Sequence, residues 1–518
     1  MKNLRDMLHD EEYNKIWDTY LGFLDLDIKE FMTIQKRLLL EQIELLNDSE
    51  LGRKIFNNQS IKSIEDFRKK VPLTTYDDYA DILLNKQNEA LPSEPLHWVQ
   101  TTWKGGDKPI KLAPYSKTMV EENTKMFLSS LILSTSKSRG HFTLRNHDKF
   151  LYGMAPRPYL TGYAPYILKN EIDFDYLPDT ERAEQLSFKE RNVEGFKLAI
   201  KHGADLFYGV SSVLVKIGES FANDSGKSGM IWPANVKQAI KLIKALYKKK
   251  IKKKPLLPKD LFEFKGIVCG GTDSATYKER IEHLFGITPL EIFGGTESAA
   301  VATETWSRNG MTFFPDVNFL EFIPEKEIKK EENTPGYKPS TVLLDEIKPN
   351  EVYELVITKL RGGAFVRYRI GDIMKCVGLK NKEDGVNLPQ VIYLDRVHNI
   401  IDLAGFTRLT KQVIGDAIKL SQLDILHYIA NKEYINNKPI IHLYLEVKGV
   451  VSDKLIKEKI NHELKQLDSD YQDVHEMLGY DPLKITRLKN NSFASFKEQK
   501  GYYPKIMNPE KETIEAML

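Results

Sequence analysis

The sequence predicts an α/β protein with a large N-terminal domain and a small C-terminal α+β domain. Three observations support this fold class. The chain has 518 residues, enough for several folding units, and its 41% hydrophobic and 29% charged residues are typical of a globular protein. From about residue 71 to residue 380, short β-rich runs alternate with helical patterns. The pattern then changes, so we expect mixed, largely parallel sheets over residues 1–395 and a small mobile domain over residues 396–518.

Residues 11–70 are expected to be mainly helical, because apolar residues such as Ile34, Leu38 and Leu39 recur at three- and four-residue intervals. The segment VPLTTYDDY, from Val71, predicts a turn that leads into a helix. The charged segment EKEIKKEENTPGYKPST, from Glu325, contains two prolines and a glycine and predicts an exposed loop. The β-rich runs cover residues 149–152, 205–208, 266–269, 289–293 and 353–358.

The C-terminal part has the pattern of a separate α+β unit of roughly 120 residues, which is within the usual domain range. We expect a helix around residues 410–420, a strand over 440–447, a helix around 454–467 and a strand near 483–488.

Charge and cysteine content exclude several classes of protein. The net charge of +2 produces no global field that would attract nucleic acid or an anionic membrane, so neither is an expected partner. Cys269 and Cys376 are too few for a disulfide framework and favour a reducing compartment. The N-terminus lacks the apolar core of a signal peptide, and no apolar run approaches the roughly 18 residues of a membrane span. We expect a soluble, cytoplasmic protein of undetermined oligomeric state.

The strongest local charge feature is LYKKKIKKKPLLPK, from Leu246 to Lys259. A phosphate or an acidic partner could bind to such a run of lysines. A solvated helix end that stops before Pro255 is the commoner meaning of the pattern, and we favour it here.

Four glycine- and acid-bearing segments are the candidates for a site, because the chain has no HExxH, GxSxG or GxxxxGKS/T pattern. The first is TTWKGGDKPIKLAPYS, residues 101–116, in which Gly105 and Gly106 permit a close approach of the backbone. An ordinary polar turn has a similar composition. The groups that could cradle a polyphosphate belong to Thr101, Thr102, Lys104, Lys108 and Lys111.

The second and fourth segments place glycine after an apolar run. In FKGIVCGGTDSATY the run ends at Gly270 and Gly271, where α/β proteins bind ligands, although a tight strand-to-helix turn has the same residues. In FVRYRIGDI, Asp372 follows Gly371 at the end of a β-rich run, where a carboxylate can accept both hydroxyls of a ribose. Asp after Gly is also ordinary turn chemistry.

The third segment, PLEIFGGTESAAVAT, has the sharpest pattern of the four. A strand candidate delivers Gly294 and Gly295, and Thr296 and Glu297 follow. Phe293 could stack on a flat ring, while the two polar residues could hold a phosphate oxygen and a magnesium ion, which prefers oxygen ligands. Glu297 could equally cap a helix.

The order and spacing of these segments resemble the auxin-responsive acyl acid-amido synthetase family. The plant enzymes of this family conjugate auxin or jasmonate to amino acids, and the family is part of the adenylate-forming superfamily of acyl-CoA synthetases, peptide-synthetase adenylation domains and luciferase. The resemblance runs from VPLTTYDDY to NNSFASFKEQKGYYPKIMNP near the C-terminus and covers most of the chain.

The resemblance implies roles for individual residues. FGGTE implies an adenine and α-phosphate contact at Thr296 and a catalytic, magnesium-linked role for Glu297, with Phe293, Gly294 and Gly295 beside the nucleotide. YRIGD implies that Asp372 holds the ATP ribose. Gly270 and Gly271 match a glycine pair next to the nucleotide.

Two more roles are implied near the domain boundary. LDRVHNIIDLAGFTRLT, from Leu394, resembles the hinge between the domains, with Arg396 at the arginine of the motif. Arg408 stands where plant members carry a phosphate-directed lysine, which implies a catalytic role. His398 replaces the acidic or lysine hinge residue of many superfamily members.

The phosphate loop departs from the superfamily pattern, in which Ser or Thr alternates with Gly before Lys-Pro-Lys. WKGGDKPIK lacks those hydroxyls and slips by one residue, although Thr102, Gly105, Gly106 and Lys108 remain the implied ATP contacts.

The resemblance implies an ATP- and Mg²⁺-dependent ligase that adenylates a small carboxylic acid and transfers the acyl group to an amine, in the first place an amino acid. Adenylation requires mainly positioning and charge neutralisation, which fits a site of glycines, hydroxyls and one acid. Two alternatives stay open: coenzyme A as the acceptor, with Lys248–Lys254 as its phosphate contact, and a non-catalytic nucleotide- or acyl-binding relative, suggested by the altered loop.

Overall fold

The structure is a computed structural model that describes residues 2–101, 110–224, 236–252, 255–261, 263–271, 274–396, 400–405, 407–449 and 451–518. The chain forms two compact units. Unit 1 contains Met1–Thr101, Ile110–Gly270 and Lys278–Asp395, and most of unit 2 is Arg396–Leu518. That these units move against each other as separate domains stays a prediction.

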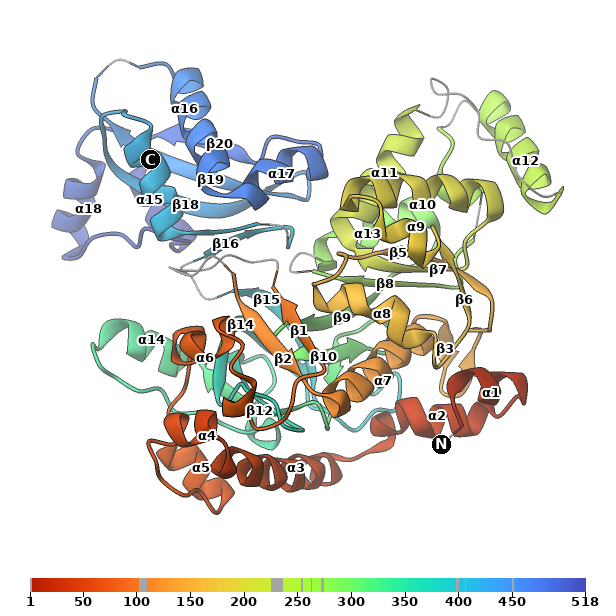
Figure 1. Cartoon of the computed structure of the whole chain (residues 1–518). Helices are drawn as coiled ribbons and strands as arrows, with labels where there is room; N and C mark the ends of the chain where they lie inside the picture. The colour runs from red at the N-terminus through yellow and green to blue at the C-terminus, as the bar shows by residue number, and fades with distance from the viewer. Residues whose placement is uncertain are drawn as a thin grey trace. The chain divides into compact units, whose positions relative to one another are not determined.

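The N-terminal part of unit 1 is helical, as predicted (Figure 1). Its longest helix, α3, begins after a capping box. The Asp27 side chain accepts a hydrogen bond from the backbone N–H of Glu30, and the Glu30 side chain accepts one from the backbone N–H of Asp27. The buried face of α3 includes Phe31, Leu38 and Leu39. The helices are α1 (Leu4–His9), α2 (Tyr13–Leu21), α3 (Ile28–Asp48), α4 (Glu50–Ile55), α5 (Ile64–Lys70) and α6 (Ala80–Leu84).

An 11-stranded mixed sheet forms the centre of unit 1, in the order β12-β13-β14-β15-β11-β10-β9-β8-β7-β5-β6. The strands from β9 to β6 are parallel, and helices connect them. The pairs β9–β10, β10–β11, β12–β13 and β13–β14 are antiparallel. The α/β class is confirmed, and parallel pairing is concentrated in one part of the sheet.

The five β-rich runs of the sequence are all strands of this sheet. The strands are β5 (Asp148–Gly153), β6 (Phe174–Leu177), β7 (Leu206–Val210), β8 (Gly266–Gly270), β9 (Leu290–Gly295), β10 (Ala299–Glu304), β11 (Met311–Phe313), β12 (Asn318–Pro324), β13 (Val352–Lys359), β14 (Tyr368–Gly378) and β15 (Gln390–Arg396). Two small hairpins, β1 (His97–Gln100) with β2 (Leu112–Tyr115) and β3 (Ser136–Ser138) with β4 (His141–Phe142), lie outside it.

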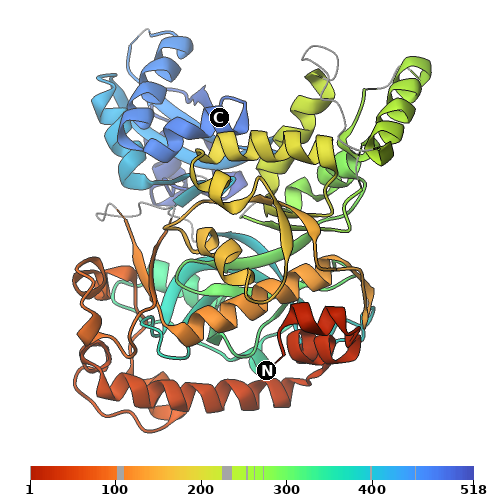
Figure 2. The same ribbon diagram turned by 45° about the vertical axis from the view of Figure 1, so that its right-hand side comes forward.

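Helix α7 (Lys117–Ser134) packs against the centre of the sheet at β8, β9 and β10 (Figure 2). Ser116 caps it, and Leu128, Leu131 and Ile132 are fully buried. The other helices of the sheet layers are α8 (Leu160–Leu168), α9 (Thr180–Glu184), α10 (Phe188–His202), α11 (Ser211–Asp224), α12 (Val236–Lys252) and α13 (Ser274–Phe285).

The exposed loop predicted for residues 325–341 is wrong over its first nine residues, whereas residues 334–341 contain no helix or strand and are mostly exposed. Residues Glu325–Asn333 form helix α14, which follows β12 directly. Ile328 is buried, and Glu331 forms a bidentate ion pair with Arg369 of β14. Because these contacts come from the sheet, the local density of charge, proline and glycine did not reveal them.

Unit 2 has the predicted α+β composition. Its core lies between helices and a three-stranded sheet in the order β18-β19-β20, and Ile441, Leu443 and Ile460 are fully buried there. The four predicted elements correspond to α15 (Lys411–Leu420), β19 (Lys438–Val447), α16 (Asp453–Leu467) and β20 (Leu483–Arg487). Further elements that the sequence did not predict are β16 (Ile400–Leu403), β17 (Thr407–Thr410), β18 (Ile425–Ile435), α17 (Ser469–Leu478), α18 (Ser492–Lys500) and α19 (Lys511–Met517).

Among the described residues, no helix combines the length and the apolar composition that crossing a membrane requires.

Candidate active site

The third glycine segment forms the tight turn between the antiparallel strands β9 and β10. Gly295 pairs with Ala299, and Gly294 pairs with Ala300. A Cβ atom on Gly294 would lie 2.3 Å from the Ala299 carbonyl oxygen, so only glycine fits at this position. The turn therefore presents Thr296 and Glu297 at the end of β9, next to the carboxyl end of parallel strand β8.

Glu297 lies in a polar cluster with Tyr368 and Lys111. The Tyr368 hydroxyl donates to Glu297 Oε1 at 3.2 Å, and Lys111 Nζ lies 3.7 Å from the same oxygen. Lys111 Nζ also donates to the Tyr368 hydroxyl at 3.3 Å and lies 5.2 Å from the centre of the Tyr76 ring. The side chains of Lys111 and Glu297 are 10% and 13% exposed, so this charge pair is largely shielded from water.

The main chain of the turn is held by side chains from three other elements. The Tyr115 hydroxyl donates to the Thr296 carbonyl at 2.7 Å. The Ser298 carbonyl accepts from Asn318 Nδ2 at 2.9 Å and from Lys359 Nζ at 3.0 Å. Burial and the nearby Glu297 charge raise the pKa of Tyr115 well above its usual value, so this hydroxyl stays a donor.

Lys359 lies in a buried group of charged residues behind the turn. Burial lowers its pKa to about 7, against the opposing effect of Asp316 and Glu122. Burial and repulsion from Asp316 raise the pKa of Glu122, which lies 3.3 Å from an Arg361 nitrogen. Lys359 can therefore exchange a proton near neutral pH while it holds the turn.

Phe293 was expected to stack on a flat ring. In the structure its ring stacks on Tyr393 of β15, with centroids 5.8 Å apart and an interplanar angle of 28°. Gly294 and Gly295 next to it are exposed. The stacked rings of Phe293 and Tyr393 form an aromatic surface beside the two glycines, here called the aromatic wall.

Asp372 lies in a bulge inside β14, not at the end of the strand. Arg369 pairs with Val356 and Ile373 pairs with Glu354, so the intervening residues of β14 oppose one residue of β13. Gly371 has a φ of +82°, which glycine adopts without strain. The bulge changes the direction of the Asp372 side chain, and the residue is 2% exposed.

Two arginines of the same strand region have structural contacts. Arg367 forms a bidentate ion pair with Glu321 at 2.8 and 2.9 Å, and the two side chains are 7% and 1% exposed. Its Nη1 also donates to the Val71 carbonyl at 2.6 Å. Arg369 binds Glu354 and Glu331 with its two edges. These contacts join β14 to β12, β13, α14 and the start of VPLTTYDDY.

The second glycine segment ends β8. Gly270 pairs with Val210 of β7, and Gly271 has a φ of +118°. Ser274 caps the following turn by donating to the Gly271 carbonyl at 2.8 Å. The short connection from β8 to α13 therefore fits the alternative interpretation of these glycines as a strand-to-helix turn. A nucleotide contact at these glycines stays a prediction.

The predicted residues after the boundary have their own local contacts. In unit 2, Arg408 Nε donates to Asp402 Oδ2 at 2.8 Å, and the Asp402 side chain is fully buried. Arg396 is the last residue of β15. Thr102, Gly105, Gly106 and Lys108 of the phosphate loop, and the hinge residues Val397, His398 and Asn399, lie outside the described residues.

Several residues that shape this site have a role that the sequence indicated only in part or not at all. Lys111 was named only as part of the phosphate loop, and Tyr368 only as part of its motif. Tyr115 could have been identified from its position in LAPYS, directly before the residue that caps α7, Ser116. Side chains that gave no local signal are Asn318, Lys359 and Tyr393.

A magnesium ion would fit at Glu297 only with help from a ligand. Within the described part of the chain, no group of three or more His, Cys, Asp or Glu residues has the arrangement of a metal site. Magnesium usually binds through one or two carboxylates together with substrate phosphates. The single carboxylate of Glu297, with its Oε1 shared between Tyr368 and Lys111, fits that mode.

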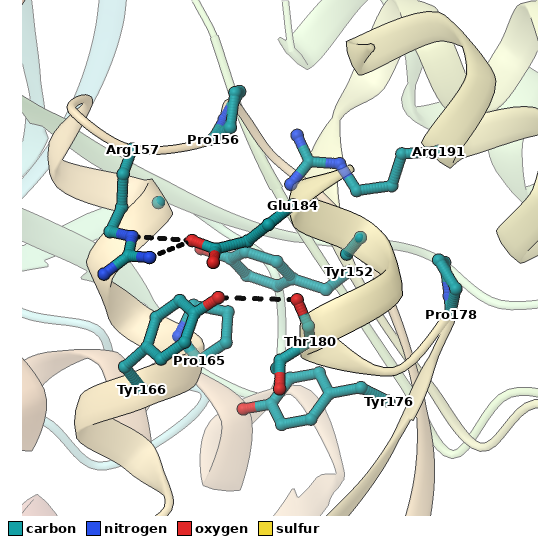
Figure 3. Close-up of a pocket in the computed structure, with 12 residues that line it drawn as sticks. Tyr152, Pro156, Arg157, Pro165, Tyr166, Tyr176, Pro178, Thr180, Glu184 and Arg191 are labelled. Carbon is teal, nitrogen blue, oxygen red and sulfur yellow. Dashed lines mark hydrogen bonds and ion pairs between the residues drawn. The ribbon is translucent and has the colours of Figure 1, made fainter. Parts of the chain in front are cut away.

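A separate cavity of about 30 Å³ lies at the ends of β5 and β6, and none of the predicted site residues lines it (Figure 3). Tyr152, Tyr166 and Tyr176 surround it, and Arg157 is paired with Glu184 on one side. A cavity of this size holds roughly two water molecules. Glu297, Lys111 and Tyr368 are not among the residues that line it.

Two segments of the chain match family models. Residues 20–155 match the GH3 family N-terminal domain, and residues 311–390 match the GH3 family central domain. The first segment includes Lys111 and Tyr115, and the second includes Tyr368 and Asp372. A jasmonoyl–L-amino acid synthetase, JAR4 of Nicotiana attenuata, is 24% identical over 242 residues. The match covers 44% of this chain and 39% of that relative, so the chain spans about two fifths of the curated relative's length.

Solved structures share the fold over nearly the whole chain. The AtGH3.15 acyl acid amido synthetase in complex with 2,4-DB covers 97% of this chain and 94% of its own, with a TM-score of 0.52 and 14% identity. A 2-hydroxyisobutyryl-CoA ligase in complex with 2-HIB-AMP and CoA covers 89% of this chain and 86% of its own, with a TM-score of 0.58 and 13% identity. The chain therefore has the fold of the adenylate-forming enzymes.

Proposed function

Because two segments of the chain match the N-terminal and central domains of the GH3 family, we propose that it is an ATP-dependent ligase. It activates a small carboxylic acid as an acyl-adenylate and transfers the acyl group to the amine of an amino acid. One observation carries the proposal: the FGGTE turn and the YRIGD strand, far apart in the sequence, meet where Tyr368 donates to Glu297.

The polar cluster suits charge neutralisation during adenylation. In that step a carboxylate oxygen bonds to the α-phosphorus of ATP, and the bond to pyrophosphate breaks. The residues must hold two anionic reactants in line and compensate their charge. Lys111 supplies a shielded cation, and Glu297 would hold Mg²⁺, which compensates phosphate charge when bound.

The other site residues have binding roles in this proposal. Asp372, aimed by the bulge in β14, accepts hydrogen bonds from the ribose hydroxyls. The aromatic wall of Phe293 and Tyr393 borders the adenine, and Thr296 contacts the α-phosphate. Arg408, whose Nε donates to Asp402 in the structure, is proposed to contact phosphate, as the resemblance implies.

Coenzyme A is the alternative acceptor. The fold similarity to a CoA ligase is as extensive as that to an amido synthetase, and the fold alone does not separate the two. We also propose that the protein acts in the cytoplasm, where ATP and amino acids are available.

Pyrophosphate exchange into ATP across a panel of carboxylic acids tests the adenylation step. Exchange that depends on one class of acid supports the ligase, and Glu297→Gln should abolish most of it. Glu325→Gln, on the exposed surface of α14, is the matched control and should leave exchange unchanged. No exchange with any acid, in a protein that still binds ATP, would indicate the non-catalytic relative.

Product analysis then identifies the acceptor. With the best acid, the enzyme is incubated with ATP and either an amino acid mixture or coenzyme A, and products are identified by mass spectrometry. An acyl-amino acid supports the proposal, whereas a thioester as the sole product contradicts the amine as acceptor.

A further inference from the structure

Helix α12 (Val236–Lys252) has a composition unlike that of the other helices of unit 1. Its 17 residues, VKQAIKLIKALYKKKIK, include seven lysines and no acidic residue. The rest of the chain is nearly neutral, with 75 Lys and Arg residues against 73 Asp and Glu. The positive charge is therefore concentrated on this helix.

One face of α12 packs on unit 1. Leu242, Ala245 and Gln238 are buried to more than nine tenths, and the helix contacts α10 and the turn at Pro258–Asp260. Pro258 and Leu256, which follow the helix, are also buried. These contacts fix which side of the helix faces away from the protein.

The opposite face is apolar and exposed. Val236, Ile240, Ile243, Tyr247 and Ile251 are 75%, 48%, 66%, 68% and 59% exposed. Their spacing of three and four residues places them on one stripe, within an arc of about 80°. Val236, Tyr247 and Ile243 are the three most exposed large apolar side chains of the described part of the chain. Such a contiguous stripe marks an interaction surface.

Lysines border the stripe. Lys244 and Lys250 are exposed, and both lie within one turn of Tyr247. Figures 1 and 2 show α12 at the periphery of unit 1, and no described helix or strand of unit 1 covers its outer face. An extended flat partner can therefore reach the whole stripe.

We propose that α12 docks this protein on the surface of an anionic lipid membrane. An amphipathic helix with lysines beside an apolar stripe lies in the plane of a membrane interface, with its apolar side chains among the acyl chains and its lysines at the headgroups. Its seven lysines make insertion across the hydrocarbon core unfavourable, so the helix lies in the plane of the interface. This surface acts independently of the proposed ligase activity.

Charge argues against the other occupants. A second copy would bring two lysine-rich helices together, and their like charges would repel. Nucleic acid would use the lysines but would leave five large apolar side chains without a partner. An acidic amphipathic peptide has the complementary chemistry, but a membrane buries the whole stripe without requiring a matching sequence.

Co-sedimentation with vesicles tests the proposal. The full chain is mixed with vesicles of phosphatidylcholine alone or with 30% phosphatidylserine, at two salt concentrations. We expect binding to the anionic vesicles, little binding to the neutral ones and at least a tenfold weaker affinity at high salt. Ile243→Glu with Tyr247→Glu should lower the affinity at least tenfold. Lys244→Glu with Lys250→Glu should lower it on anionic vesicles.

Two matched variants control for charge and folding. Leu40→Glu and Leu45→Glu change leucines of α3 that are 40% and 41% exposed, and they should leave vesicle binding unchanged. Circular dichroism shows whether each variant keeps its melting temperature. Equal loss of binding in the α3 variants would contradict a specific role of α12.

Three other results would overturn the proposal. If the wild-type protein fails to sediment with anionic vesicles, this result contradicts the proposal directly. A dimer in sedimentation equilibrium that Ile243→Glu with Tyr247→Glu disrupts would identify a second copy as the occupant. Binding to DNA or to a polyglutamate peptide that equals vesicle binding, and that needs the lysines but not the apolar stripe, would identify a polyanion.

Discussion

The FGGTE turn and the YRIGD strand are stabilised in different ways. In the turn, side chains donate to main-chain carbonyls: Tyr115 donates to Thr296, and Asn318 and Lys359 donate to Ser298. The strand is held by an ion pair instead, because Arg367, directly before the strand, is buried against Glu321. The arginines of YRIGD and its flank therefore hold the strand in place, and a ligand contact at Asp372 stays a prediction.

The comparison also separates two kinds of carboxylate. Glu297 keeps 13% of its side chain exposed and shares Oε1 between a hydroxyl and an ammonium group. Asp372 is 2% exposed and is aimed by a bulge. Glu297 therefore suits a contact with a group whose charge changes during a reaction. Asp372 suits a contact with a ligand group whose charge stays the same.

The largest effect is expected from Arg367→Met. This change removes the bidentate partner of the buried Glu321 carboxylate and leaves Arg68 Nε, at 3.6 Å, as its cationic neighbour, so the free energy of unfolding should fall by at most about 3–5 kcal/mol. Urea unfolding measures this loss. Arg367→Met combined with Glu321→Leu should recover part of the stability, because the buried carboxylate is removed and Arg68 keeps Glu346 at 3.8 Å. If the double variant is less stable than the single one, the pair is not an isolated charge interaction.

Glu297→Gln should affect catalysis much more than stability. The substitution keeps the shape of the side chain and removes the charge that balances Lys111. We expect adenylate formation to slow on the order of 10²- to 10³-fold while ATP binding changes little, because the lost interaction is stronger in the transition state. Single-turnover measurements test this. A wild-type rate would reduce Glu297 to a structural element of the turn.

Asp372→Asn should weaken ATP binding about ten- to a hundredfold, because charge-assisted hydrogen bonds contribute about 1.5–3 kcal/mol. The side chain keeps its volume, so the bulge should persist. Isothermal titration calorimetry with ATP measures the effect. Thermal unfolding of the ligand-free variant is the control, and an unchanged dissociation constant in a folded variant would contradict the ribose contact.

Lys359→Met should have the smallest effect at neutral pH, and its signature is a pH dependence. Burial lowers the pKa of Lys359 from 10.5 to about 7. Between these values the unfolded chain holds a proton that the folded chain has released, so this lysine makes the free energy of unfolding rise with pH.

The wild type should therefore gain stability relative to Lys359→Met from pH 7 to pH 9, and the difference should be constant below pH 7. Chemical denaturation at several pH values measures it. A difference that stays flat from pH 6 to pH 9 would show that Lys359 keeps its proton while it holds the turn.

Local sequence determined the elements whose information is contiguous. The helices of residues 11–70, the β-rich runs and the glycine turns were predictable because periodicity, caps and backbone freedom act over a few residues. The position of Gly294 is of this kind, since its turn closes within six residues onto Ala299. The α/β class and the order of the candidate segments followed from the same signals.

Tertiary structure alone decided which partners hold those segments. Tyr115 is 181 residues from Thr296, and Glu321 is 46 residues from Arg367. The local sequence around a residue does not indicate which distant residue will pair with it. The same limit explains α14, where Glu331 finds Arg369 across the sheet. Propensity and spacing act locally, whereas burial and ion pairing depend on what folding brings next to each side chain.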